Sequence, residues 1–352
     1  MSFIHSSKNL NLFSPFFVQK GKKILFKNLN FLHQNHNHKQ KFLQKSIFFL
    51  MNNAEKSFKT IEKIFTPVVV PEGVGAKVRR IIGTTHLPRL DPFLMLDHFN
   101  VKLPGGFPDH PHRGFETVTY MQEGEVFHED FKGNKGRLGP GDLQWMTAGK
   151  GILHAEMPGS WEQEAIGFQL WINLASKNKF CEPGYQEISK DKVLIAKKDG
   201  VTAKVIAGEA LGAKGPIYAR TPALYLDIKM EPNSKFEQVI PKGWNSFSYV
   251  YKGRAYYGES KKEVKTNSVA LLKKDDKEVL LIETKGEEAQ LIIIAGQPLN
   301  EPMVQYGPFV LSDEKELAKT FEDYRFGKNG FEDAPGWESE IRQLSRSKSG
   351  VF

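Results

Sequence analysis

From about residue 60 onward, short apolar runs alternate with turns rich in glycine and proline, and this spacing restricts the fold more than any other feature. The turns include Pro104-Gly105-Gly106, Gly139-Pro140-Gly141 and Gly149-Lys150-Gly151. Because glycine and proline both weaken the interior of a helix, little room is left for helices between these turns. The pattern predicts an all-β chain whose short antiparallel strands form barrels or a sandwich.

The clearest single elements are one strand and one helix. Between Ile166 and Leu174 apolar residues occupy every second position, which places one face of a strand in a core and leaves Gln169 and Trp171 on the other. Helical patterning is sparse, and the best candidate is a short C-terminal helix, SDEKELAKTFEDYR, from Ser312 to Arg325. We expect Ser312 to be its N-cap, and a glycine two residues beyond it to end it.

Two runs in the first half carry the residues best suited to chemistry. His110 and His112 stand two apart in HPHRGFETVTY, and His154 and Glu156 stand two apart in GDLQWMTAGKGILHAEMP. Side chains two apart on a strand point to the same face. Either pair alone would usually consist of side chains that face solvent or already have hydrogen-bond partners. Here, however, both pairs lie in sequence typical of strands, with hairpin signals between them. Together they predict one metal ion bound by three imidazoles and one carboxylate.

This ligand set restricts the kind of metal. Nitrogen ligands with one carboxylate and no thiolate suit iron, manganese, nickel, copper or zinc. Four protein ligands on an ion that accepts six leave two positions for water, dioxygen or a chelating substrate. The set therefore predicts a catalytic site rather than a structural one.

The second half repeats the short strands without the histidines. The expected strands are Leu224–Met230, Ser246–Tyr251, Ala255–Tyr257, Val269–Leu272, Val279–Ile282 and Ala289–Ala295. Where the first half has its His-x-His pair, the second offers Phe236-Glu237-Gln238, which supplies no imidazole. We interpret this as a duplicated barrel in which one copy binds a metal and the other packs against it, so one metal per chain is expected.

The positive charge of the chain is confined to its first 54 residues. They hold eight lysines and no acidic residue, which accounts for the whole formal net charge of +8. The remainder is balanced, so direct binding of nucleic acid by the folded part is not expected. The single cysteine, Cys181, rules out an internal disulfide and is typical of a reducing compartment. No apolar run approaches the roughly 20 residues needed to cross a membrane.

Residues 1–54 are expected to be an extension that is either disordered or a targeting segment. Their basic, acid-free composition is similar to that of a mitochondrial presequence, although they contain no arginine. Another reading is that the chain begins at Met51. We expect a cytoplasmic and nuclear protein, with mitochondrial import as the alternative.

Seven runs between about residue 60 and residue 335 carry a family resemblance: DPFLMLDHF, GGFPDHPHRGFETVTY, GDLQWMTAGKGILHAEMP, KDGVTAKVIAGEALG, RTPALYLD, IPKGW and GPFV. Together they resemble the pirin family, whose members are bicupins of the cupin superfamily. The resemblance implies two antiparallel β-barrels, with a metal-binding cupin domain at residues 55–195 and a second cupin domain without metal at residues 196–352. It also implies Fe(II), with ligands at four matching positions: His110, His112, His154 and Glu156.

Glu116 occupies the position from which general cupins take their carboxylate ligand. It shares strand parity with His110 and His112, so we expect it to face the same interior. Following the pirin pattern, we expect Glu116 to orient a ligand imidazole and not to bind the metal itself.

The resemblance implies two functions. The first is an iron-dependent quercetin 2,3-dioxygenase acting on a flavonol-like substrate and dioxygen, in which the metal supplies Lewis acidity and Glu156 or Glu116 accepts a proton. The second is an iron-dependent nuclear cofactor that binds a transcription-factor protein. A purely structural metal site ranks last, because such sites normally fill their coordination with protein ligands. Turnover of a flavonol separates the enzyme from the binding module.

Overall fold

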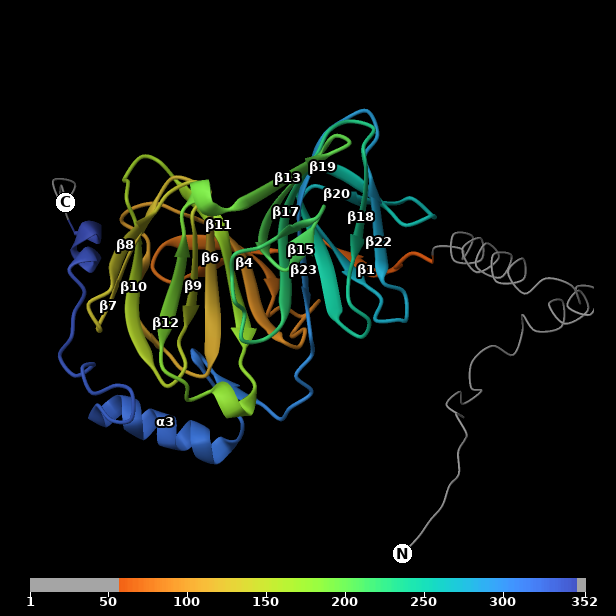
Figure 1. Ribbon diagram of the computed structural model, residues 1–352. Helices are drawn as coiled ribbons and strands as arrows, with labels where there is room; N and C mark the ends of the chain where they lie inside the picture. The colour runs from red at the N-terminus through yellow and green to blue at the C-terminus, as the bar shows by residue number, and fades with distance from the viewer. Residues whose placement is uncertain (1–56, 347–352) are drawn as a thin grey trace, which may run out of the picture. The chain divides into compact units, whose positions relative to one another are not determined.

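The computed structural model describes residues 57–346, and two antiparallel β-barrels make up most of this part of the chain (Figure 1). The seven-stranded sheet of the first barrel contains, in spatial order, β12 (Gly184–Ile188), β9 (Leu143–Thr147), β6 (Phe115–Glu123), β11 (Ala165–Asn173), β4 (Phe93–Val101), β3 (Ala76–Ile82) and β2 (Val69–Glu72). Its four-stranded sheet contains β5 (Phe107–His112), β10 (Ile152–Pro158), β7 (Val126–Asp130) and β8 (Lys135–Leu138). The expected extension at residues 1–54 and the alternative start at Met51 lie outside the described residues.

The second barrel is built from one ten-stranded sheet. Its main path is β1 (Ile61–Phe65), β21 (Ser268–Leu272), β19 (Asn245–Tyr257), β23 (Ala289–Gly296), β17 (Ala223–Met230), β14 (Val201–Ala207) and β13 (Leu194–Lys198), and off this path lie β18 (Lys235–Val239), β20 (Lys262–Lys265) and β22 (Val279–Glu283). The smaller elements are the hairpins β15 (Glu209–Ala210) with β16 (Ala213–Lys214) and β24 (Val304–Tyr306) with β25 (Phe309–Leu311), the helix α3 (Glu314–Phe326), and the 3-10 turns η2 (Ser176–Asn178), η3 (Lys190–Lys192) and η4 (Ile341–Ser345). The predicted bicupin fold with one short C-terminal helix is thereby confirmed.

Both ends of the described chain cross between the barrels. Strand β1 precedes the first barrel in sequence but pairs with β21 of the second. Beyond the second barrel the chain returns to the first, where Leu317 of α3 and Phe331 pack with Met146 and Ile152 in one apolar cluster. In Figure 1 the blue helix lies next to the yellow and green strands of the first barrel. The domain division expected after residue 195 stays a prediction, and packing crosses it at both ends.

The barrels join through a shared apolar core. Phe168 and Leu170 of β11 pack there with Tyr225 of β17 and Phe247 of β19. Each such side chain stabilises the folded state by roughly 1.5–3 kcal/mol when it is fully buried, which accounts for the two barrels forming one compact unit. The second barrel is filled by a further apolar cluster that includes Phe236, from the segment expected to correspond to the His-x-His pair.

The predicted strand at Ile166–Leu174 is β11, and the predicted helix is α3 with a different cap. The side chain of Asp313, not that of Ser312, accepts a hydrogen bond from the backbone N–H of Glu316 at 2.8 Å. Glu316 in turn accepts from the backbone N–H of Ser312, which completes a reciprocal cap. Neither α3 nor any other helix in residues 57–346 is long and apolar enough to span a membrane.

Two strands expected in the second half are in fact one. The 13 residues of β19 (Asn245–Tyr257) run through Gly253, where the sequence pattern indicated a break. A bulge between Val250 and Lys252 and the positive φ of 69° at Gly253 absorb the irregularity. Bulges of this kind bend a strand without ending it, and periodicity alone does not reveal them.

Lys179 carries a buried amine that forms hydrogen bonds with three different segments of the chain. Its Nζ donates to the Asn173 side chain at 2.7 Å and to the carbonyl oxygens of Gly114 and Val310, both at 3.1 Å. The residue is only 1% exposed. Burial lowers the pKa of its ammonium from 10.5 to about 8, although Glu316 and Glu301 nearby oppose the change. Charging this amine therefore costs the folded protein roughly 3 kcal/mol relative to the unfolded chain.

We expect the stability of the protein to rise as the pH increases from about 8 to about 9, which lies between the folded and unfolded pKa of Lys179 and below the range in which tyrosines of the unfolded chain lose their protons. In this interval the unfolded chain binds a proton at Lys179 that the folded protein does not, so a higher pH favours folding. Denaturant unfolding at several pH values measures the slope. Lys179→Met should flatten it, whereas Lys177→Met, at an exposed neighbouring lysine, should not. A slope that is the same in both variants would contradict the assignment.

Candidate metal centre

Three imidazoles converge inside the first barrel. His110 and His112 lie on β5, and His154 lies on the neighbouring strand β10, directly opposite His110. Their ligand nitrogens all lie within 4.8 Å of one another, and His110 Nε2 is 3.0 Å from His154 Nε2. Within residues 57–346 this is the only group of three or more His, Cys, Asp or Glu side chains that is close enough to hold a metal ion.

The hydrogen bonds of these rings fit a metal ion. His110 Nδ1 lies 2.8 Å from the carbonyl oxygen of Pro108 and must donate to it, which leaves the lone pair on Nε2 facing the other imidazoles. The Nδ1 atoms of His112 and His154 are buried without a hydrogen-bond partner. The edges that meet are the Nε2 edges of His110 and His154, and an ion between them would take up the lone pair that the hydrogen bond to Pro108 leaves on His110 Nε2.

The electrostatics keep the imidazoles in the form that binds metals. Burial lowers the pKa of His110, and it lowers the pKa of His112 and His154 well below the usual value, with the neighbouring imidazoles adding to the effect for these two. All three rings are therefore neutral at physiological pH. Neutral imidazole is the ligating species, so no proton has to be displaced when an ion binds.

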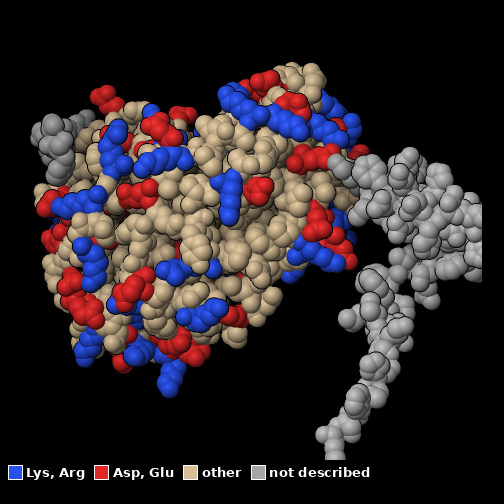
Figure 2. All heavy atoms as spheres, in the orientation of Figure 1, with Lys and Arg blue, Asp and Glu red and all other residues tan. Residues whose placement is uncertain are grey.

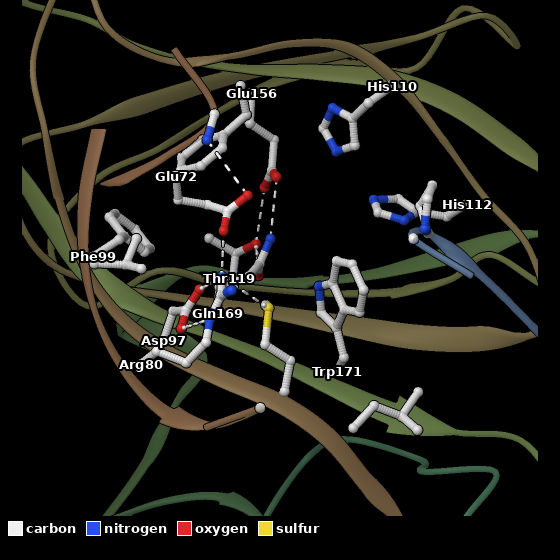
Figure 3. A pocket seen from close by; sticks show the side chains of 18 of the residues that line it. Glu72, Arg80, Asp97, Phe99, His110, His112, Thr119, Glu156, Gln169 and Trp171 are labelled. Atoms are coloured by element: carbon white, nitrogen blue, oxygen red, sulfur yellow. Dashed lines mark hydrogen bonds and ion pairs between the residues drawn. The ribbon is translucent and has the colours of Figure 1, made fainter. Parts of the chain in front are cut away.

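Glu156 lies beside the three imidazoles and points to the opposite wall of the barrel. Thr119 on β6 donates to Oε1 at 3.0 Å, and Gln169 on β11 donates to Oε2 at 3.1 Å (Figure 3). The register of β10 against β5 shifts between His154 and Glu156, so the regular pairing that places His154 opposite His110 does not extend to Glu156. Burial raises the pKa of Glu156 to about 6, opposed by these two hydrogen bonds. Its role as the fourth ligand stays a prediction.

Glu116 lies on the other face of its sheet. Along β6 it shares a face with Val118 and Tyr120, whose side chains lie in the core between the barrels, whereas Thr119 points into the first barrel and binds Glu156. The Glu116 carboxylate accepts a hydrogen bond from Thr147 at 2.7 Å. This placement differs from the expectation that it faces the histidines. The reason is the turn at Gly114, whose φ of 88° breaks the parity counted from His112.

The two carboxylates should respond differently to the same substitution. We expect Glu156→Gln to weaken the binding of a divalent transition metal by at least about 10-fold, because the residue predicted as the fourth ligand loses its charge. Glu116→Gln should leave metal affinity unchanged, since Glu116 contacts Thr147 and not the imidazoles. Competition with a chelator of known affinity measures both. Equal losses would mean that Glu116 acts on the metal after all.

A cavity of about 720 Å³ opens beside the imidazoles. This volume suits a small-molecule ligand. Near the imidazoles its wall carries Thr119, Gln169 and Trp171, and its apolar lining includes Phe99 and Phe107. The alternation in β11 predicts that Gln169 and Trp171 point away from the apolar core, and this polar and aromatic face is the one signal in the sequence for the cavity wall.

The far side of the cavity carries an ion-paired cluster that the sequence did not indicate (Figure 3). The Arg80 guanidinium donates to Asp97 at 2.8 Å and to Glu72 at 2.5 Å. The hydrogen bond to Asp97 is the main reason why the pKa of Arg80 is raised, so it stays charged. Because two carboxylates accompany one guanidinium, this wall offers no free positive charge to a ligand. The three residues come from three strands, and no local spacing connects them.

Comparison with known sequences gives one consistent result. A family model described as Pirin matches residues 75–172, and a model of the pirin C-terminal cupin domain matches residues 225–330. Pirin from Homo sapiens is 52% identical over 274 residues, which cover 77% of this chain and 93% of the human protein. A pirin-like protein from Solanum lycopersicum is 48% identical over 270 residues, which cover 76% of this chain and 92% of that protein.

Solved structures share the fold. The crystal structure of a quercetin 2,3-dioxygenase from Acinetobacter baumannii has a TM-score of 0.71 and 31% sequence identity, covering 78% of this chain and 99% of that one. The bacterial pirin YhhW from Escherichia coli, in complex with nickel(II), has a TM-score of 0.55 and 17% identity, covering 67% of this chain and 99% of that one. At this lower identity the likeness concerns the fold alone.

Proposed function

The chain belongs to the pirin family, and from this premise we propose that it is an iron-dependent dioxygenase of the quercetin 2,3-dioxygenase type, acting on flavonol-like substrates and dioxygen. The observation that carries the proposal is the group of three neutral imidazoles, two of them buried, beside a cavity large enough for such a substrate. The structural similarity to a bacterial quercetin 2,3-dioxygenase at 31% identity supports the same reaction class.

The resident metal is Fe(II), one ion per chain, and its ligands are His110, His112, His154 and Glu156. Other divalent transition metals also suit nitrogen ligands with one carboxylate. When bound, the ion supplies Lewis acidity and holds the reactants in place. Phe236 and its apolar neighbours fill the second barrel, which supports a single site per chain.

The protein's own residues bind and deprotonate the substrate. Phe99 and Phe107 provide apolar surface for aromatic rings and exclude water from the cavity. Glu156 lies next to the imidazoles with a pKa of about 6, so near neutral pH its carboxylate accepts the proton of a substrate hydroxyl at one of its oxygens. Thr119 and Gln169 hold that carboxylate in place. Glu116 is not available for this task, because it faces the core between the barrels.

The test is a flavonol depletion assay coupled to oxygen consumption. Purified protein loaded anaerobically with Fe(II) should consume quercetin and oxygen together, and protein stripped of metal should regain activity when Fe(II) is returned. Stoichiometric iron without consumption of any flavonol would overturn the enzymatic proposal.

The second candidate is an iron-dependent nuclear cofactor that binds a transcription-factor protein, in the cytoplasm and nucleus. On most of the face drawn in Figure 2, basic and acidic side chains are intermixed, apart from a run of basic side chains along its upper right edge. A mixed surface of this kind favours a protein partner over direct contact with nucleic acid. Iron binding without flavonol turnover in the assay above would favour this function.

A further inference from the structure

The two residues that flank the His110 and His112 pair are both anchored to the C-terminal part of the chain. Asp109 precedes the pair and Arg113 follows it. We propose that residues 314–346 form a clamp that fixes the spacing of the ligand imidazoles, with Asp109 and Arg113 as positioning residues. The inference rests on the proposed function only in that the site binds a transition metal.

Arg113 forms the first half of the clamp. Its side chain is completely buried, and its Nη1 donates to Asp323 of α3 at 2.8 Å and to Thr320 at 3.0 Å. Its Nη2 donates to the carbonyl oxygen of Asn329 at 2.8 Å. The guanidinium also lies 4.6 Å from the ring centre of Phe331. These four partners belong to the C-terminal segment, and Nε donates to the carbonyl oxygen of Lys150 at 2.6 Å. Arg113, the residue after His112, is therefore tied both to the C-terminal segment and to the turn before β10.

Asp109 forms the other half. The hydroxyl of Ser339 donates to it at 2.5 Å, and the guanidinium of Arg342 lies 3.3 Å from the same carboxylate. The adjoining turn η4 places Ile341 and Leu344 in an apolar cluster with Ala155 of β10. Ala155 lies between His154 and Glu156. The clamp therefore touches both strands that carry the proposed ligands.

The composition of β5 explains why such anchors are needed. The strand lies at the edge of its four-stranded sheet and pairs only with β10. Two of its six residues, Pro108 and Pro111, have no backbone N–H to contribute to that pairing. An edge strand with so few donors is weakly held by its own sheet. The side-chain anchors at Asp109 and Arg113 supply the missing restraint on each side of His110 and His112.

We test the clamp through metal affinity, in full-length protein, with Fe(II) and Co(II) as probes and a chelator as competitor. Ser339→Ala removes the hydroxyl that binds Asp109, and Asp323→Asn removes the charge that Arg113 faces. Each should raise the Kd for the metal by about 10-fold, the usual effect of losing a residue that orients a ligand. Asp333→Ala is the matched control, because it breaks the exposed ion pair with Lys132 in the same segment, away from β5. It should leave the Kd unchanged.

A second readout separates positioning from general stability. The absorption spectrum of bound Co(II) reports the geometry of its ligands, and it should change in Ser339→Ala and Asp323→Asn but not in Asp333→Ala. A Kd within twofold of the wild-type value in Ser339→Ala, at a temperature where the variant is folded, would overturn the clamp even if Asp323→Asn did not fold. Wild-type protein that binds no transition metal would overturn the clamp and the proposed function together. Metal binding without flavonol turnover would overturn only the latter.

Discussion

Replacing His154 with Ala should abolish stoichiometric iron in the purified protein. His154 is the single imidazole that β10 contributes to the group, and its Nε2 lies 3.0 Å from that of His110. Without it only the two imidazoles of β5 remain. A divalent ion such as Fe(II), in a site that has no thiolate, depends on imidazole nitrogens for tight binding. Elemental analysis after anaerobic loading with Fe(II) and removal of excess metal measures the loss.

His86→Ala is the control for this measurement. His86 is an exposed histidine outside the group of three imidazoles. Its replacement removes one imidazole from the chain but should leave one iron per chain in place. Full metal content in both variants would show that His154 is not a ligand.

The second large effect is expected for Gly114→Ala, which should prevent the first barrel from folding stably. Gly114 joins β5 to β6 with a φ of 88°, and an added Cβ would lie 1.9 Å from the carbonyl oxygen of Val310. That oxygen is backbone and also accepts from the buried amine of Lys179, so it cannot easily move. We expect a loss of about 4 kcal/mol or more in the free energy of unfolding, together with loss of metal.

Gly133→Ala separates the steric clash from backbone strain. Gly133 has nearly the same φ, 87°, but an added Cβ there would have nothing within 4 Å. Its replacement should cost only about 1–2 kcal/mol, the price of a left-handed conformation for a residue with a Cβ. Denaturant unfolding of both variants gives the two values. Similar losses would mean that the contact with Val310 is not what makes Gly114 necessary.

Several features of the protein follow from sequence because they depend on near neighbours. The alternation in Ile166–Leu174 predicts β11, since side chains two apart share a face. The same rule pairs His110 with His112, and the structure brings these two imidazoles together with that of His154. The bicupin fold and the C-terminal helix were also predictable, from the spacing of turns and from the resemblance to the pirin family.

Other features were decided only by the tertiary structure. Glu116 was expected to face the histidines, but the turn at Gly114 reverses the count of faces between β5 and β6. The hydrogen bonds that hold Glu156 come from Thr119 and Gln169, on two strands of the other sheet of the first barrel.

The sequence also does not predict that segments at both ends of the described chain pack against the barrel that is farther away in sequence. Strand β1 joins the second barrel, and the segment 314–346 returns to the first, where it binds both sides of the His110 and His112 pair. Periodicity within a strand fixes which side chains share a face. It does not fix which strands become neighbours, because that choice depends on how the apolar faces of distant segments are buried together.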